Sequence, residues 1–232
     1  MTSGRLRPSG GHRVLAVATG LLALSGLICI GVAVTHDAKP QQPALSRGES
    51  AQPSTAGASP VEPPKDVATS ATPVVGPVLK ASVPVALNIP AIGVRSVVQR
   101  LGQAADGSVE VPAPGPRYDQ AGWYRYSPTP GSLGPSVIVG HVDSAANGPS
   151  VFWRLGSLHP RDIVRITRAD GSVAVFAVDD VRRFRKSRFP SKLVYGNTDH
   201  AALRLITCGG PIEGGHYRDN IVVRASLVRS EA

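Results

Sequence analysis

The chain has 232 residues and carries 25 Lys and Arg against 16 Asp and Glu, a formal net charge of +9. This length accommodates one or two domains, and the uneven composition favours one domain with appendages. The charge suits a neighbour that is an anionic polymer or a membrane surface. The two cysteines, Cys29 in an apolar run and Cys208 in the expected core, are poorly placed to pair, which excludes a disulfide framework.

An uncharged apolar segment, residues 14–34, follows a short N-terminus, residues 1–13. It reaches the roughly 20 residues that a membrane-spanning helix needs and exceeds the apolar region of a cleaved signal peptide. Arg5, Arg7 and Arg13 precede it, so the positive-inside rule places the N-terminus in the cytoplasm. We therefore expect a single-pass anchor in the plasma membrane with the rest of the chain extracellular, out of reach of intracellular nucleic acid.

Residues 35–80 are dominated by Pro, Ala, Ser, Gln and Thr and have almost no large apolar side chain. Such a segment cannot bury a core, and its prolines favour extended conformations. We expect a disordered linker that acts as a stalk between the anchor and a folded domain.

Residues 81–232 are long enough for one packed domain and contain short β-branched runs separated by turn residues. The runs are VPVALNI, SVEVP, SVIVG, DIVRIT, SVAVFAVDDV, ALRLIT and NIVVRASLV. Asp170-Gly171 separates two of them as a hairpin turn would. The pattern predicts an all-β barrel or sandwich, with one short helical stretch over 151–158 packed on it.

Three polar residues stand at the ends of these predicted strands. His141 follows SVIVG, Cys208 ends ALRLIT, and Arg218 begins the strand NIVVRASLV. Residues at strand ends are held by the sheet and still reach the surface, where a scaffold can present catalytic groups. We therefore take the three as candidate catalytic residues.

Acyl transfer requires this combination of side chains. A free thiol has a pKa of roughly 8.5 and needs a partner such as imidazole to move its proton. A permanently charged guanidinium suits the stabilisation of the oxyanion that forms next. Cys208 is then the nucleophile, His141 the proton-transfer partner and Arg218 the oxyanion stabiliser. Gly209-Gly210-Pro211 forbids the helix that follows the nucleophile in papain-like peptidases.

These motifs resemble the class F sortases of high-GC Gram-positive bacteria. The matching segments are NIPAIGV, GHVDS, GPSVFWRLGSL, FPSKLVYG, LRLITCGG and YRDNIVV, which together extend over residues 81–232. The resemblance implies an eight-stranded β-barrel and cleavage of an LPXTG-like sorting signal between Thr and Gly. It also implies a thioester on Cys208 that an amine of a cell-wall (peptidoglycan) precursor resolves, with secreted proteins as substrates.

One position departs from the common sortase signature TLXTC, because Arg204 replaces its leading Thr. Strand alternation places Arg204 on the same face as Cys208, so a packing or substrate-groove role is expected. Thr207 and Gly209, which flank the nucleophile, are further candidate substrate-binding residues. Asp143 either orients His141 or forms a turn. No acidic cluster is evident, and we predict no required metal and no cofactor.

Two alternatives remain open at the level of sequence. A cysteine L,D-transpeptidase would also use Cys, His and Arg, although the expected His-Gly and Gly-Cys pairings are missing here. A catalytically idle wall-binding module would leave Cys208 as a buried structural residue. The basic stretch 182–186 is either a patch for an anionic polymer or a solvated hairpin face.

Overall fold

The computed structural model describes residues 39–45 and 73–232. The predicted N-terminus, the predicted transmembrane segment and most of the predicted stalk lie outside these residues. Within the described ranges, no helix is long and apolar enough to cross a bilayer.

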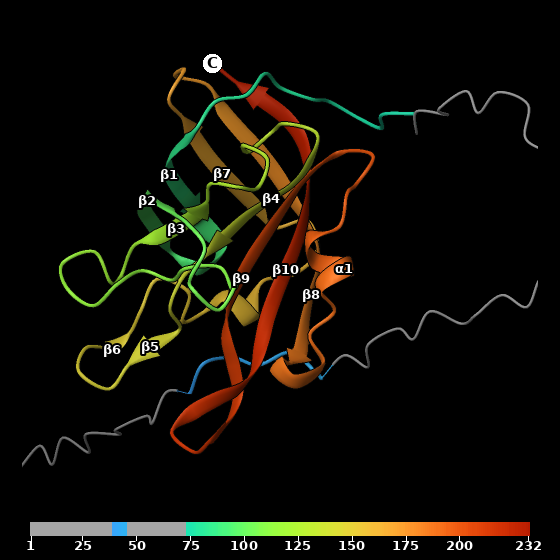
Figure 1. Ribbon diagram of the computed structural model, residues 1–232. Helices are drawn as coiled ribbons and strands as arrows, with labels where there is room; N and C mark the ends of the chain where they lie inside the picture. Colours follow the sequence, from blue (N-terminus) through green and yellow to red (C-terminus); the bar gives the residue numbers. More distant parts are fainter. Residues whose placement is uncertain (1–38, 46–72) are drawn as a thin grey trace, which may run out of the picture. The chain divides into compact units, whose positions relative to one another are not determined.

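Eight strands form a closed barrel in the order β1-β2-β3-β4-β9-β10-β8-β7 (Figure 1). Neighbouring strands are antiparallel except for two parallel pairs, β2 with β3 and β4 with β9. The barrel confirms the all-β, eight-stranded expectation. Its strands are β1 (Pro84–Ile89), β2 (Val94–Leu101), β3 (Ala121–Tyr124), β4 (Gly134–Val139), β7 (Ile163–Arg168), β8 (Val173–Arg185), β9 (Ala201–Glu213) and β10 (His216–Glu231). A small hairpin, β5 (Asp143–Ser144) with β6 (Gly148–Pro149), lies outside the barrel sheet.

Two apolar clusters cover opposite faces of the central strands. Ile138, Leu205 and Val223 belong to the larger cluster, and their direct neighbours in the chain belong to the smaller one. Successive side chains of a strand point to opposite faces, so the larger cluster fills the barrel and the smaller one coats its outside. Val194 of helix α1 (Ser191–Tyr195) joins the outer cluster, and this helix therefore covers the outer face.

The helical content differs in part from the prediction. Over 151–158 the chain forms turns and one short 3-10 helix, η2 (Leu155–Ser157), with Phe152 and Leu155 fully buried, as expected for packing on the barrel. Helix α1 was not predicted, because five residues after a proline are too short for a helical period. Two further 3-10 turns are η1 (Pro90–Ile92) and η3 (Lys186–Arg188).

The predicted strand over 108–112 is wrong. In this part of the chain, Val109 makes only an isolated bridge to Gln103, and Gly107 closes the turn between them with a φ of 82°. The segment instead belongs to the long connection between β2 and β3, which passes over the end of the barrel that carries His141.

Residues from the predicted stalk also contact the barrel. The backbone N–H of Leu79 donates to the carbonyl of Gly131 at 2.8 Å, and that of Val75 donates to Asp199 at 2.7 Å. The side-chain oxygen of Gln42 accepts from the backbone N–H of Gly210 at 2.7 Å. The packing of this unit thus extends before residue 81.

Candidate active site

The pairing of β4 with β9 brings His141 and Cys208 to neighbouring strands. The last pair of this parallel ladder joins Val139 to Ile206, and the Gly140 N–H donates to the Ile206 carbonyl at 3.2 Å. His141 comes two residues after the end of β4, whereas Cys208 lies two residues further along β9, which continues to Glu213. His141 and Cys208 are 67 positions apart in the sequence, and the pairing of β4 with β9 alone brings them to neighbouring strands.

The orientation of His141 is fixed from two sides. Its Nε2 lies 2.8 Å from the carbonyl oxygen of Pro112, and a carbonyl only accepts, so Nε2 carries a proton. In the neutral ring, Nδ1 is then the nitrogen free to accept a proton. The ring of Tyr118 stacks on the imidazole with centroids 4.0 Å apart and planes 4° apart.

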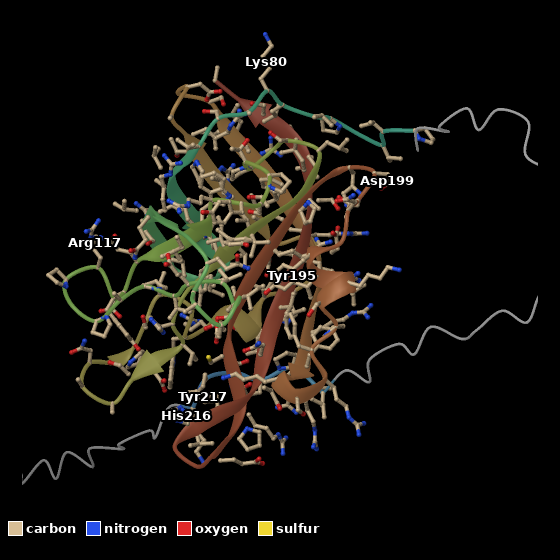
Figure 2. The ribbon with its side chains drawn as sticks, viewed as in Figure 1. Lys80, Arg117, Tyr195, Asp199, His216 and Tyr217 are labelled. Atoms are coloured by element: carbon tan, nitrogen blue, oxygen red, sulfur yellow. The ribbon has the colours of Figure 1, made fainter. Side chains whose placement is uncertain are left out.

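Asp143 binds two tyrosines that surround the histidine. Its carboxylate accepts from the Tyr217 hydroxyl at 2.6 Å, and its backbone carbonyl accepts from the Tyr118 hydroxyl at 2.9 Å. Burial and then the Asp143 carboxylate raise the pKa of both phenols, and a thiolate at Cys208 raises it further. Asp143 thus holds the tyrosines that frame the site, and Tyr217 lies near the lower end of the β9–β10 hairpin in Figure 2.

Cys208 presents a free, half-buried thiol within β9, just past the stretch that pairs with β4. The Lys186 ammonium donates to its sulfur, with Nζ and Sγ 3.5 Å apart. Lys186 belongs to the basic stretch 182–186, whose other members Arg182 and Arg183 pair with Asp180 and Asp219. Carboxylates therefore neutralise two charges of this stretch, and a third charge, that of Lys186, contacts the thiol.

Arg218 lies on β10 beside the nucleophile strand. Asn220 pairs with Cys208 and Asp219 with Gly209, while the ladder is irregular between Tyr217 and Asp219. The Arg218 guanidinium donates to Asp219 at 3.0 Å and to Glu213 at 2.8 Å. The hydrogen bond with Asp219 is the main cause of a raised Arg218 pKa, so the charge is permanent. In this conformation the guanidinium is engaged by carboxylates at the edge of the site.

The three candidate substrate-binding residues differ in exposure. Thr207 is buried, and its hydroxyl donates to the Gly140 carbonyl at 2.8 Å, which ties β9 to β4 just before His141. A Cβ on Gly209 would lie 2.8 Å from the Ile221 side chain, so only glycine fits there. Arg204 faces the same side as Cys208 but is 4% exposed, which favours the packing role.

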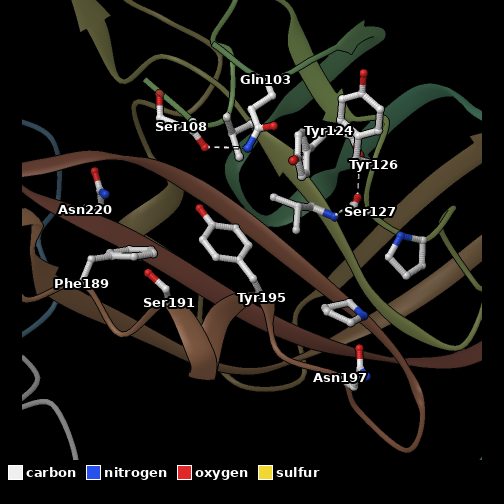
Figure 3. Close-up of a pocket in the computed structure, with 15 residues that line it drawn as sticks. Gln103, Ser108, Tyr124, Tyr126, Ser127, Phe189, Ser191, Tyr195, Asn197 and Asn220 are labelled. Atoms are coloured by element: carbon white, nitrogen blue, oxygen red, sulfur yellow. Dashed lines mark hydrogen bonds between the residues drawn. The ribbon is translucent and has the colours of Figure 1, made fainter. Parts of the chain in front are cut away.

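A pocket of about 660 Å³ opens beside this end of the β9–β10 pair (Figure 3). Gln103 and Ser108 stand on one wall, and Phe189 and Tyr195 stand on the opposite wall. Asn220, which pairs with Cys208 in the strand ladder, lines the pocket, whereas His141, Cys208 and Arg218 do not. The remaining lining residues are Gly107, Val109, Tyr124, Tyr126, Ser127, Pro128, Pro135, Val137, Ser191 and Asn197.

Sequence reasoning missed the residues that position the histidine. Pro112 and Tyr118 come from the β2–β3 connection, far from His141 in sequence, and nothing in their spacing marks them. Lys186 was noticed only as one charge of a basic stretch. Among the described residues, no group of three or more His, Cys, Asp or Glu is arranged to hold a metal ion.

Comparison with known proteins supplies the family. Residues 87–228 match the sortase domain family. The solved sortase A of Listeria monocytogenes is 18% identical with a TM-score of 0.48, covering 66% of this chain and 90% of that one. Sortase A of Corynebacterium diphtheriae is 21% identical with a TM-score of 0.48, covering 65% and 62%. SrtA of Actinomyces oris is 20% identical with a TM-score of 0.47, covering 70% and 89%. A comparison with curated proteins found no match.

The closed barrel carries a free thiol, Cys208, and an imidazole, His141, on or just beyond two neighbouring parallel strands, an arrangement that suits acyl transfer by a cysteine enzyme. Because the domain match covers more than half of the chain, the chain belongs to the sortase family. Sortases are cysteine transpeptidases that act on cell-wall proteins bearing sorting signals, so the chain is such an enzyme. Membership also removes the L,D-transpeptidase and the idle wall-binding module as alternatives.

Proposed function

We propose that this enzyme cleaves an LPXTG-like sorting signal between Thr and Gly and transfers the protein to an amine of a peptidoglycan precursor. The observation that carries the proposal is the parallel pairing of β4 with β9 within a sortase domain, which places His141 and Cys208 each two residues beyond the last pair, Val139 with Ile206. The sequence resemblance to class F sortases supports the same substrate.

The first half-reaction forms a thioester. The Cys208 sulfur attacks the carbonyl carbon of the signal threonine, and the charge that develops on the carbonyl oxygen is stabilised by Arg218. His141 takes the Cys208 proton at Nδ1 as the sulfur attacks, and as the C–N bond breaks it gives this proton to the departing glycine amine. Arg218 must turn from Glu213 or Asp219 towards the substrate for this role, and a peptide in the site would draw it there.

The second half-reaction regenerates the enzyme. The acceptor amine attacks the thioester carbon, a new C–N bond forms, and the C–S bond breaks to release the Cys208 thiolate. His141 takes the proton that the amine loses. No electrons are gained or lost overall, so the cycle needs no redox partner and no cofactor.

We assign the sorting signal to the pocket beside Asn220. Its aromatic side chains, Tyr124, Tyr126, Phe189 and Tyr195, offer apolar surface for the leucine and proline of the signal. A peptide with these residues in the pocket would extend its threonine towards Cys208, which pairs with Asn220 at the pocket edge.

The test combines the full-length protein with an LPXTG peptide and a small amine. We expect a ligated product, and without the amine an adduct on Cys208 in mass spectrometry. Cys208→Ala should abolish turnover, and Cys208→Ser should nearly do so, because an alkoxide is far harder to form than a thiolate. Undiminished turnover in either variant would refute the thioester.

We further propose that the protein is a class F enzyme anchored in the plasma membrane with its catalytic domain outside. The support is the uncharged segment 14–34 with arginines before it. Protease added to intact, wall-stripped cells should release a fragment containing residues 81–232. Complete protection of this fragment would contradict the topology.

A further inference from the structure

Lys186 reaches the nucleophile across an intervening strand. It follows Arg185, which pairs with Asp219 of β10, and Asp219 in turn pairs with Gly209, next to the nucleophile. Strands lie about 4.8 Å apart, so two strand spacings separate the backbones of residues 186 and 208 by roughly 10 Å. The lysine side chain closes this gap and brings Nζ to 3.5 Å from Sγ.

The hydrogen bond between Lys186 and Cys208 has only one possible donor. An ammonium has donors and no acceptor, so Lys186 donates and the sulfur accepts. A hydrogen bond of this kind strengthens when the acceptor is ionised. The contact therefore favours the thiolate over the thiol at Cys208.

Two arginines on the strands next to β9 and β10 have carboxylate partners. Arg218 is held by Glu213 and Asp219, and Arg183 lies 3.5 Å from Asp219. Glu213 and Asp219 therefore hold the guanidinium groups of both arginines. Lys186, in contrast, directs its charge to the sulfur itself.

We propose that Lys186 is a further catalytic residue, which stabilises the Cys208 thiolate both as nucleophile and as leaving group. Negative charge sits on sulfur before the first attack and returns to it when the acceptor amine expels the thiolate. Arg218 acts on the carbonyl oxygen between these two moments. The role of Lys186 towards the leaving group rests on the proposed transpeptidase function. Its role towards the nucleophile concerns the thiol alone.

The primary experiment measures alkylation of Cys208 by iodoacetamide at pH 7. The full-length protein in detergent is used, and the Cys208 peptide is followed by mass spectrometry because Cys29 also carries a thiol. Lys186→Met should slow alkylation about fivefold, the size expected for one exposed charge beside another. Lys186→Arg should keep more than half of the rate.

The matched control is Lys192→Met. Lys192 is exposed, lies in the same segment and does not line the pocket, so its loss removes the same charge without touching the site. It should leave alkylation unchanged. Equal rates in Lys186→Met and Lys192→Met would overturn the proposal, whether both fall or neither does.

A second measurement separates this inference from the proposed function. When a thioester preformed from an LPXTG peptide is mixed with an excess of the amine, Lys186→Met should resolve it more slowly than the wild type, because the thiolate is a poorer leaving group without the ammonium. If the wild type cleaves no sorting-signal peptide, the proposed function fails, and the alkylation rates still decide whether Lys186 acts on the thiol.

Discussion

Two clusters of charge lie along the same pair of strands, β9 and β10, and they differ in depth. Midway along the strands, Arg204 pairs with Arg224 in register, and Asp180 of β8 accepts from Arg224. At the end of the strands, Arg218 contacts Glu213 and Asp219. The difference lies in one arginine of each: Arg204 of the first cluster is 4% exposed, whereas the Arg218 side chain of the second is 26% exposed.

The pKa values of the two arginines shift in opposite directions. Burial, and then the charge of Arg224, lowers the pKa of Arg204 to about 10. The hydrogen bond with Asp219 instead raises the pKa of Arg218. Both remain charged near neutrality, but the Arg218 side chain is 26% exposed and reaches a substrate once it leaves Glu213 and Asp219. Exposure, and not charge, therefore makes Arg218 the better candidate of the two for the oxyanion role that we propose.

The largest expected effect comes from Arg218. Arg218→Ala should lower kcat by about 10²–10³, the usual cost of losing a main oxyanion donor. Arg218→Lys should be nearly as damaging, since an ammonium cannot reproduce the planar donor geometry. The measurement is the kinetics of peptide cleavage, with folding checked by circular dichroism. A folded Arg218→Ala enzyme that keeps most of its activity would contradict the oxyanion role of Arg218.

A smaller loss should follow from removing the ring that stacks on His141. Tyr118→Ala should lower kcat about tenfold with KM little changed, since an aromatic pair is worth about 0.5–1.5 kcal/mol. Tyr118→Phe keeps the stack and loses only the hydrogen bond to Asp143, so it should restore most of kcat. Equal damage by both variants would show that the hydroxyl, and not the ring, positions the imidazole.

Arg204→Met tests the first cluster directly. We expect kcat/KM within about threefold of the wild type and a free energy of unfolding that is unchanged or higher, because replacing a buried charge by an apolar side chain is often neutral or stabilising. Urea unfolding and peptide kinetics measure the two. A loss of activity close to that of Arg218→Ala would instead support the substrate-groove role.

The smallest effect concerns Asp180 and depends on pH. Burial raises its pKa, but the hydrogen bond and charge of Arg224 outweigh this and lower it. Because the folded pKa lies below the unfolded value of about 3.9, the stabilisation is present above pH 4 and is lost as pH falls through the folded pKa. Asp180→Asn should therefore unfold more easily than the wild type at pH 7, by about 1 kcal/mol. The difference should vanish in more acidic urea titrations.

The sequence was informative where strands are long and apolar. The runs that became β4, β8, β9 and β10 stand out by β-branched residues. The prediction that Cys208 ends its strand was wrong, because β9 continues to Glu213. Two barrel strands were not predicted: β3 has only four residues, and the polar residues of β2 interrupt its apolar run. The alternation of 108–112 was misleading because Gly107 and Pro112 confine it to a loop.

The positions around the thiol could not have been predicted in the same way. The contact of His141 with Pro112 depends on how the β2–β3 connection passes over the barrel, and that of Lys186 with Cys208 depends on the order of β8, β10 and β9. Both are tertiary contacts between segments without a shared local pattern. Only the strand order brings them together.

The pairing of β4 with β9 also determines which changes of length the chain can tolerate. Side chains alternate along a strand, so deleting one residue between Ala202 and Thr207 would turn Cys208 towards the barrel interior unless the whole ladder slipped. Insertions in the β5–β6 hairpin, which lies outside the barrel sheet, leave that ladder untouched. Length variation among related enzymes should therefore gather in such hairpins and spare β4 and the part of β9 that leads to Cys208.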